Sequence, residues 1–347
     1  MGIDQQLSAV ETELYDRQIR LWGIESQERL RASNVLLIGV RGLGSEIAKN
    51  ILLSGINSLV ILDDGIVSEE EQQKNFFLTQ NSIGKMIAEE FIIKAQLLNP
   101  LVKLTADTSD PTKKDAKFFE GFTMVVATRI KTDFLMKIDQ ICRASKIKLL
   151  FGDVFGSFGY SISDFQEHEY YVDQIKFSTV KRSLLDIGTR PEKSEKEIVK
   201  VKHQLVFPEL KEVLIMPNTE QSVDHIKKIR KINPYFYFML ILLEFRNRQG
   251  RNPEISYKIK DVQLLKDIKK EVLRDYGADR FESELDDDLF ELVFGEVVPV
   301  CAIVGGVLAQ EVIKGVSKKE VPIYNVFLFD PLTYSGKEQL IKTSKQY

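Results

Sequence analysis

Cysteine and histidine are both scarce in this sequence. Its 347 residues include only two cysteines, Cys142 and Cys301, and the three histidines stand far apart, with none in an H-E-x-x-H arrangement. Two cysteines cannot build a disulfide framework or a four-cysteine zinc site within one chain. We therefore predict that the chain holds no metal site of its own.

A strong net charge and a long uncharged apolar run are also missing. The net charge is −3, with 29% charged residues, so a general electrostatic attraction to nucleic acid or to an anionic membrane is not expected. No uncharged run reaches about 18 residues, and the N-terminus has no apolar signal region. We expect a soluble, intracellular protein that binds neither nucleic acid nor membrane.

What the sequence does contain is a glycine-rich turn directly after the apolar residues 35–38. Gly39, Gly42 and Gly44 form this turn, and a helical apolar pattern follows at once. The order is typical of the strand, phosphate turn and helix N-terminus of a nucleotide-binding βαβ unit. A second apolar run ends at Asp63, about 20 residues further on, where a carboxylate can bind a ribose hydroxyl. These four residues are the candidate nucleotide-binding residues.

The glycine spacing does not match the dinucleotide fingerprint G-x-G-x-x-G in either register. Counting from Gly39 places Arg41 at the middle glycine, and counting from Gly42 places Ile47 at the third. The side chain of Arg41 would intrude where the backbone has to approach a phosphate. A conventional NAD site is therefore disfavoured, and close packing of the strand against the helix is the alternative role for this turn.

Apolar runs and amphipathic patterns alternate along much of the chain. Strands are predicted at residues 35–38, 59–62, 123–127, 148–151 and 325–330, and helices at 8–23, 25–32, 82–98, 132–145 and 299–314. The first helix begins with a capping box between Ser8 and Glu11, and an acidic connection is expected at residues 68–74. This alternation predicts an α/β fold with a doubly wound, mostly parallel, Rossmann-like sheet.

The middle of the chain has a different character. Glycines and aromatic residues between Gly152 and Tyr171 indicate antiparallel strands at a sheet edge. Residues 181–202 are highly charged and are interpreted as a surface loop, and helices are predicted at 224–245 and 262–276. The basic cluster on the first of these helices is interpreted as a solvated face, with a nuclear-import signal as the alternative; it comprises Lys227, Lys228, Arg230 and Lys231.

These patterns suggest one domain that is interrupted by an insertion. We assign residues 1–160 to the first part of the Rossmann-like domain and residues 161–291 to an inserted α+β region. Residues 292–347 then return to the first domain.

Four separate stretches, in the same order and at similar spacing, resemble a known family. They are residues 15–23 (YDRQIRLWG), the glycine turn, residues 152–156 (GDVFG), and the helix that begins with Pro299-Val300-Cys301 and continues through Ala309-Gln310-Glu311. Together they resemble the regulatory, non-cysteine subunits of the heterodimeric SUMO-activating enzymes, from about Leu14 to Asp330. These enzymes belong to the ubiquitin-like activating enzymes, which share an adenylation-type domain with bacterial enzymes of the molybdopterin and thiamin pathways.

The resemblance implies a function that two subunits carry out together. Such an enzyme uses ATP and Mg²⁺ to adenylate the C-terminal carboxylate of SUMO, transfers the acyl group to a cysteine as a thioester, and passes it to a conjugating enzyme. In the heterodimeric form only one subunit keeps the ATP site and the cysteine. The expected partners are thus a catalytic subunit, SUMO and, through the complex, a conjugating enzyme. The resemblance also implies a nuclear location, with the cytoplasm possible.

Departures from the family's motifs indicate which subunit this chain is. The arginine of an S-N-x-N-R-Q motif has no counterpart after Ser68, Ile87 stands at the lysine position of a G-x-x-K-A motif, and Ile130 stands at the position of a magnesium-binding aspartate. Losing these groups leaves phosphate charge uncompensated and the metal without a protein ligand. With Arg41 in the glycine turn, we expect the site at Gly39, Gly42, Gly44 and Asp63 to be degenerate and non-functional.

The resemblance also assigns roles to the cysteines and to one arginine. Cys142 and Cys301 lie in predicted helices and lack the sequence context of a thioester-forming cysteine, so both are expected to be small buried residues. Arg17 matches the arginine of the family's Y-x-R-Q-I motif, which reaches across the subunit interface to the ATP phosphates in the partner's site. We expect Arg17 to act there in trans, as an arginine finger does, whereas the role of Arg20 is left open.

Three alternatives remain to be weighed against this interpretation. A self-sufficient homodimeric adenylyltransferase would need the arginine, lysine and aspartate that the chain lacks. A scaffold protein without a catalytic role would have no use for Arg17, whose alternative role is that of a solvated surface residue. The equivalent subunit of an enzyme for another ubiquitin-like modifier is the third possibility.

Overall fold

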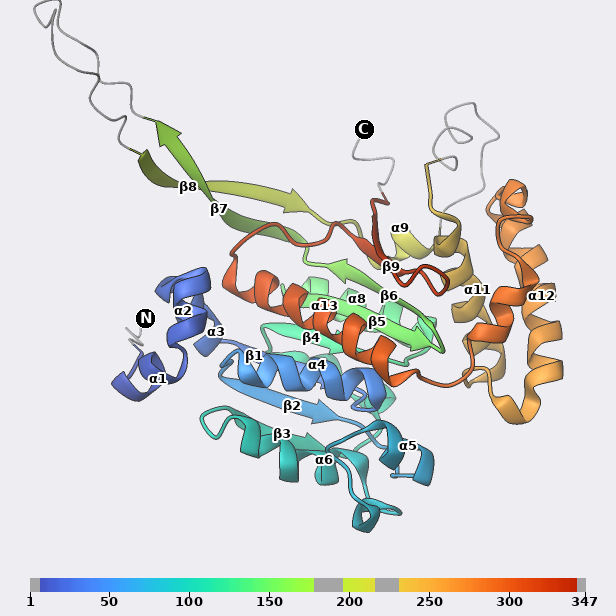
Figure 1. Ribbon diagram of the computed structural model, residues 1–347, viewed down its shortest axis with the longest axis horizontal. Coiled ribbons are helices and arrows are strands. Elements are labelled where there is room, and N and C mark those ends of the chain that lie inside the picture. The colour runs from blue at the N-terminus through green and yellow to red at the C-terminus, as the bar shows by residue number, and fades with distance from the viewer. Residues whose placement is uncertain (1–6, 178–195, 216–230, 342–347) are drawn as a thin grey trace, which may run out of the picture.

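An eight-stranded sheet forms the centre of the molecule (Figure 1). The computed structural model describes residues 7–177, 196–215 and 231–341. The sheet consists of β1 (Asn34–Ile38), β2 (Ser58–Leu62), β3 (Lys103–Asp107), β4 (Met124–Ala127), β5 (Lys148–Phe155), β6 (Phe158–Asp164), β9 (Val326–Phe329) and β10 (Gly336–Gln339). Their order is β10-β9-β6-β5-β4-β1-β2-β3. Neighbours from β5 to β3 are parallel and the other pairs antiparallel, which confirms the predicted fold class.

Helices cover both faces of this sheet. One face carries α3 (Ile24–Arg31), α4 (Gly42–Leu53), α6 (Ile87–Ala95) and α13 (Val298–Ser317). The other carries α7 (Ala116–Phe119), α8 (Thr132–Ala144), α9 (Leu210–Leu214), α11 (Pro234–Gln249) and α12 (Lys258–Asp275). Successive residues of β1 alternate between the two cores, as strand geometry requires: Val35 and Leu37 join the first, Leu36 and Ile38 the second.

The predicted C-terminal helix is confirmed as α13. Among the described residues it is also a helix long and apolar enough to cross a membrane, but 67% of its most apolar window is buried inside the protein. It packs against α4 and α3 and contributes Val304 and Leu308 to the core. We therefore interpret α13 as a core helix.

The N-terminal helix differs from its prediction because it is broken at Tyr15. The capping box between Ser8 and Glu11 is present and opens α1 (Ala9–Leu14), and Gly23 ends α2 (Asp16–Trp22). Tyr15 is buried, and its hydroxyl accepts a hydrogen bond from Asn99 Nδ2 at 2.9 Å. Anchoring this ring in the body of the domain turns the chain between the two helices.

Several other predicted boundaries were wrong for local reasons. The acidic connection is a short helix, α5 (Glu69–Lys74), capped by Ser68. The next helix starts at Ile87 rather than residue 82, because Gly84 adopts a positive φ of 84° in the turn before it. Strand β3 was not predicted, since its polar alternation at the sheet edge lacks an apolar run.

The predicted charged loop was wrong from residue 196 onward. There β8 (Lys196–Val206) pairs with β7 (Glu167–Phe177) in a two-stranded arm that projects away from the sheet (Figure 1). Helix α11 begins at Pro234 with Asn233 as its cap. Residues 224–230 of that prediction, including Lys227, Lys228 and Arg230, lie outside the described residues, and Lys231 is exposed in a turn rather than in the predicted helix.

The division of the chain into a domain and an insertion remains a prediction. The edge that we set between residues 160 and 161 falls inside β6, which pairs with β5 on one side and β9 on the other.

Candidate functional site

A cavity of about 240 Å³ opens at the carboxyl ends of β1, β2 and β4. Strand order reverses at β1, because the chain passes from β1 to β2 on one side and later places β4 on the other. Ligands of doubly wound folds bind at such a switch point. The lining includes Gly39, Arg41, Asp63, Thr128, Arg129, Ile130, Arg246, Arg251 and Asn252. The structure therefore brings the predicted glycine turn and Asp63 together at one place.

The glycines of the turn are required for close packing. Gly39 has a φ of 85°, and a β-carbon there would lie 2.5 Å from Thr128 Oγ1. A β-carbon on Gly44 would collide with the carbonyl oxygen of Gly39. The packing role that we gave as the alternative for this turn is thus fulfilled, whether or not a phosphate ever binds there.

The carboxylate of Asp63 is occupied by backbone groups. Its Oδ2 accepts a hydrogen bond from the amide of Val40 and its Oδ1 from that of Gly65, both at 2.9 Å. The side chain is buried and shapes the two turns on either side of it. Each carboxylate oxygen thus holds a backbone amide and keeps a further lone pair, and Asp63 also lines the cavity.

Residue 41 contributes a side chain to the cavity rather than a bare backbone. Arg41 Nη1 pairs with Glu71 Oε1 at 2.7 Å, and its guanidinium lies against Gly65. Glu71 belongs to α5, the helix that stands in place of the family's arginine-containing motif. The charge of Arg41 is therefore compensated within the chain.

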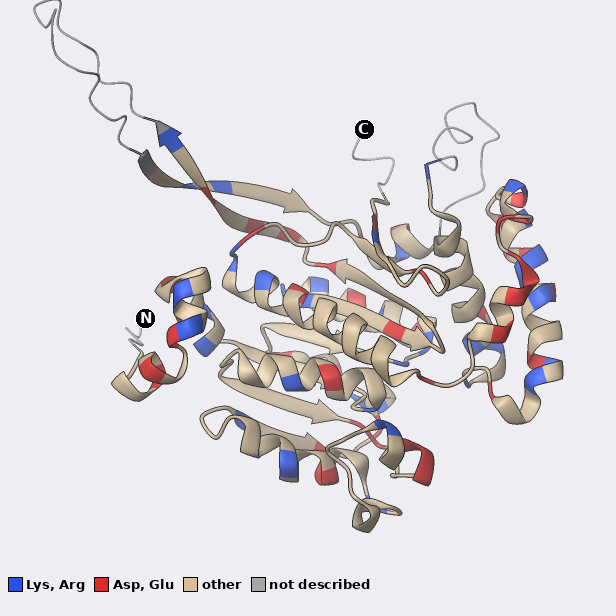
Figure 2. Ribbon diagram, viewed as in Figure 1, with Lys and Arg blue, Asp and Glu red and all other residues tan. Residues whose placement is uncertain are grey.

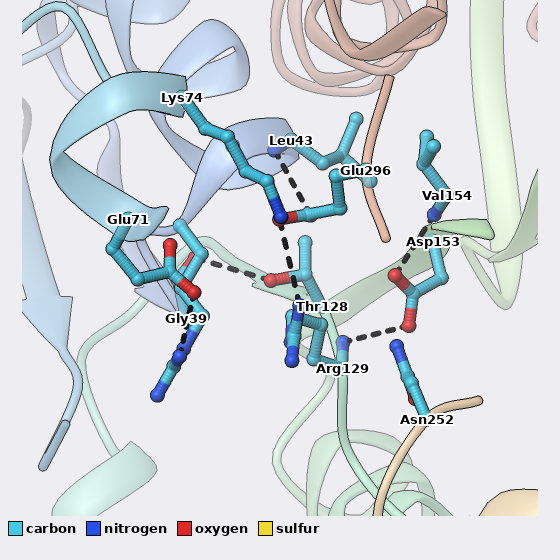
Figure 3. A network of polar contacts seen from close by, with 12 residues as sticks. Gly39, Leu43, Glu71, Lys74, Thr128, Arg129, Asp153, Val154, Asn252 and Glu296 are labelled. Carbon is cyan, nitrogen blue, oxygen red and sulfur yellow. Dashed lines mark hydrogen bonds and ion pairs between the residues drawn. The ribbon is translucent and has the colours of Figure 1, made fainter. Parts of the chain in front are cut away.

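A second buried network lies under the cavity and was not predicted. Asp153, from the residue 152–156 motif, forms an ion pair with Arg246 of α11, and the two side chains are 0% and 3% exposed. Asp153 Oδ2 also accepts from the amide of Arg129 at 3.1 Å, and Oδ1 from the amide of Val154 at 2.8 Å (Figure 3). Arg246 in turn donates to Asn252 Oδ1 at 2.7 Å. This network ties α11 to the ends of β4 and β5.

The first turn of α4 faces the carboxylate of Glu296, which sequence reasoning also missed. Glu296 Oε1 lies 3.5 Å from the amide nitrogen of Leu43, and Oε2 lies 3.4 Å from Arg129 Nη1 (Figure 3). Burial raises the pKa of Glu296 above its ordinary value, and Arg129 opposes that rise. The only signal in the sequence is its position immediately before the predicted helix at 299–314.

Every arginine that lines the cavity has a carboxylate partner in this chain. The pairs are Arg41 with Glu71, Arg129 with Glu296, Arg246 with Asp153, and Arg251 with Asp261. The charges of these four arginines are thus compensated within the chain, whereas Lys131, which also lines the cavity, makes no ion pair within the described residues.

Two further positions, where the family's motifs have a lysine and an aspartate, are occupied by isoleucines in this chain. Ile130 lines the cavity at the place of the magnesium-binding aspartate, and Ile87 is fully buried in the core. Within the described residues, no cluster of three or more histidine, cysteine or acidic side chains could hold a metal ion. At these two positions the chain therefore supplies neither the cation nor the metal ligand that the family's motifs contain.

Both cysteines are buried. Cys142 lies in α8 and Cys301 in α13, and burial raises the pKa of each thiol above its ordinary value. A thiol with a raised pKa and no access to solvent is a poor nucleophile.

Arg17 belongs to α2, which lies at the side of the sheet where β1 begins (Figure 1), whereas the cavity lies at the carboxyl ends of the strands. Its side chain is exposed, and it makes no hydrogen bond or ion pair with any residue that the structure describes. Arg20 differs, because its guanidinium pairs with Asp16 at 3.0 Å. Both arginines are exposed, Arg20 by 78%, and of the two only Arg17 lacks an ion pair within the described residues.

Exposed apolar side chains lie on the same helix as Arg17 and on its neighbours in the chain. Val10, Leu14, Leu21 and Ile24 on α1, α2 and the start of α3 are 51–74% exposed. The first half of α13, which carries no charged residue from Val298 to Gln310 (Figure 2), also exposes Ile303, but this half lies at the end of α13 away from α2 (Figure 1). We call the four residues on α1 to α3 the apolar interface surface. Exposed apolar groups of this size mark protein–protein contacts in many proteins.

Comparison with known proteins agrees with these features. The ThiF family matches residues 15–346. SUMO-activating enzyme subunit 1 of Rattus norvegicus is 38% identical over 337 residues, covering 96% of this chain and 95% of the relative. The Homo sapiens protein of that name is 39% identical over 333 residues, covering 95% of each.

A solved structure supports the fold alone. The crystal structure of PaaA has a TM-score of 0.56 at 14% identity and covers 98% of this chain and 76% of that one. From the family match and the full-length relatives, we conclude that this chain belongs to the ThiF family.

Proposed function

We propose that this chain is the regulatory, non-cysteine subunit of a heterodimeric SUMO-activating enzyme. With a catalytic partner it supports ATP- and Mg²⁺-dependent adenylation of the SUMO C-terminus and thioester formation on the partner's cysteine, before transfer to a conjugating enzyme. The observation that carries this proposal is 38–39% identity to proteins named SUMO-activating enzyme subunit 1 over at least 95% of this chain.

In this proposal the chain's own nucleotide site is degenerate. The cavity's arginines are paired with internal carboxylates, and Asp63 is committed to backbone amides. Ile87 and Ile130 supply neither a cation nor a metal ligand. ATP and Mg²⁺ therefore bind in the partner subunit.

Arg17 is the residue that this chain contributes to catalysis. Its guanidinium is exposed and unpaired within the described residues, and the apolar interface surface lies on the same helix and on its neighbours in the chain. When that surface is covered by the partner, Arg17 is carried into the interface, where it neutralises charge on the ATP phosphates as the SUMO carboxylate attacks. Cys142 and Cys301, which are buried, have no catalytic role in this proposal.

Two competing functions make different predictions. A scaffold subunit would assemble with the partner but would not need Arg17. A subunit for another ubiquitin-like modifier would support the same chemistry with a different substrate.

The test is reconstitution with candidate catalytic subunits. Each pair, and this chain alone, is assayed for ATP–pyrophosphate exchange that depends on an added modifier, either SUMO or another ubiquitin-like protein. The proposal predicts SUMO-dependent exchange by the heterodimer and none by this chain alone. Exchange that depends on a different modifier, or robust exchange by the isolated chain, would contradict it.

A further inference from the structure

The N-terminus of α4 holds an anion that belongs to the protein itself. Glu296 Oε1 accepts a long hydrogen bond from the amide of Leu43 at 3.5 Å, and a β-carbon added to Gly42 would lie 3.0 Å from Oε2. Free amides and the helix dipole attract anions to this position, which is where the phosphate of a βαβ nucleotide site binds. A carboxylate therefore lies at the place expected for a phosphate group.

The backbone fixes Glu296 in this position. Residue 296 forms a β-bridge with Gly156, the glycine of the turn between β5 and β6. The amide of Gly156 donates to the carbonyl of Gly295 at 2.8 Å, and Gly295 itself has a φ of 70°. Because both flanking segments are held, the carboxylate reaches α4 from a rigid support.

The side chain is buried and aimed into a positively charged position. It is 1% exposed, and its Oε2 has no hydrogen-bond partner among the described residues. The contact of Oε2 with Arg129, at 3.4 Å, is a charge interaction, and Lys74, whose ammonium group forms an ion pair with Glu70, projects toward the same carboxylate (Figure 3). A buried carboxylate with an unfilled acceptor needs compensation by nearby positive charge, and here this comes from Arg129, Lys74 and the helix end.

We propose that the first turn of α4, Arg129 and Lys74 form a latent anion site for phosphate or pyrophosphate, which the chain keeps closed with the carboxylate of Glu296. This inference rests on the proposed function, in which the chain's own nucleotide site is degenerate. It adds a reason why that site does not bind phosphate. Loss of catalytic side chains removes metal and phosphate contacts, whereas Glu296 fills the remaining phosphate position. Removing that carboxylate restores anion binding without restoring catalysis.

The experiment titrates inorganic pyrophosphate into the full chain by calorimetry. Glu296→Ala and Glu296→Gln are compared with the unchanged protein, and Glu296→Ala is also combined with Arg129→Ala. Glu46→Ala serves as the matched control. Glu46 is a buried glutamate of α4 itself, and its partner, Lys49, lies further along α4, away from the helix N-terminus. Thermal unfolding establishes that each variant is folded, and Glu296→Gln retains the shape of the side chain if the alanine variant does not fold.

We expect pyrophosphate to bind at least tenfold more tightly to Glu296→Ala than to the unchanged chain, and also more tightly to Glu296→Gln, which loses the repelling charge but keeps the side-chain volume. The gain should be lost when Arg129 is also replaced, and should be absent in Glu46→Ala. Folded Glu296 variants that bind no more tightly than the unchanged chain would overturn the inference and leave the degenerate site intact. Tight binding of Mg-ATP by the unchanged chain would instead overturn the degenerate site, and the inference with it.

Discussion

Asp153 and Arg246 show how single residues hold the cavity in shape. Both side chains are almost fully buried, and each also makes hydrogen bonds to the loops around the cavity. A buried pair of this kind contributes little net stability compared with well-packed apolar residues, but losing one partner leaves an uncompensated charge. The pair therefore makes α11 and the end of β5 interdependent.

Replacing Arg246 by methionine should destabilise the fold by about 3–5 kcal/mol, because Asp153 then lacks its buried counter-ion. Urea unfolding followed by circular dichroism measures the change. Arg248→Met is the matched control on the same helix, where the exposed pairs with Glu244 and Glu271 are worth about 1 kcal/mol or less. Equal losses in the two variants would contradict the role given to the buried pair.

The parts of the candidate site that lie next to a recognisable strand or motif in the sequence could be predicted. The glycine turn, Asp63 and the apolar replacements Ile87 and Ile130 all lie within a few residues of a recognisable strand or motif. Glu296 was not predictable, because a contact between residues 43 and 296 depends on how the chain returns to the sheet. No periodic pattern carries that information.

At the level of elements, prediction succeeded where apolar periodicity was strong and the element was buried. Strands β1, β2, β4 and β9, and helices α8 and α13, were recovered within a few residues. Strands β3, β8 and β10 were missed, because a sheet edge or a projecting arm allows polar residues on both faces of a strand. The break at Tyr15 was missed because it is set by the distant Asn99.

The N-terminal helices also respond to pH through Glu11. The amide of Ser8, followed by Arg31, lowers the pKa of Glu11 below its ordinary value of 4.5. A carboxylate with a lowered pKa contributes stability above its unfolded pKa and loses it as the pH falls through the folded one. Glu11→Gln should therefore lower Tm at neutral pH, and the difference should close below about pH 4. A pH-independent difference would show that the ionised carboxylate is not the stabilising species.

At the scale of the whole molecule, Arg17 and the apolar interface surface are on the outside, where a partner protein can contact them. The four arginines of the cavity are paired with carboxylates of the same chain, whereas Arg17 and the apolar interface surface are exposed on one side. Charges of both signs are spread over the surface helices (Figure 2), so no single-sign field competes with this surface for partners. The architecture of a nucleotide-binding domain is kept, and in the proposed function its contribution to catalysis is Arg17, at the interface with the partner.

The most direct test of this account measures SUMO-dependent ATP–pyrophosphate exchange in the reconstituted heterodimer with Arg17→Ala. Arg20→Ala is the matched control, since that arginine lies one turn along α2 and is already paired with Asp16. Co-purification with the partner establishes that each variant still assembles. The account predicts that Arg17→Ala lowers the exchange rate by about tenfold or more, and that Arg20→Ala leaves it nearly unchanged. Normal exchange by an assembled Arg17→Ala heterodimer would contradict the account and identify the chain as a scaffold.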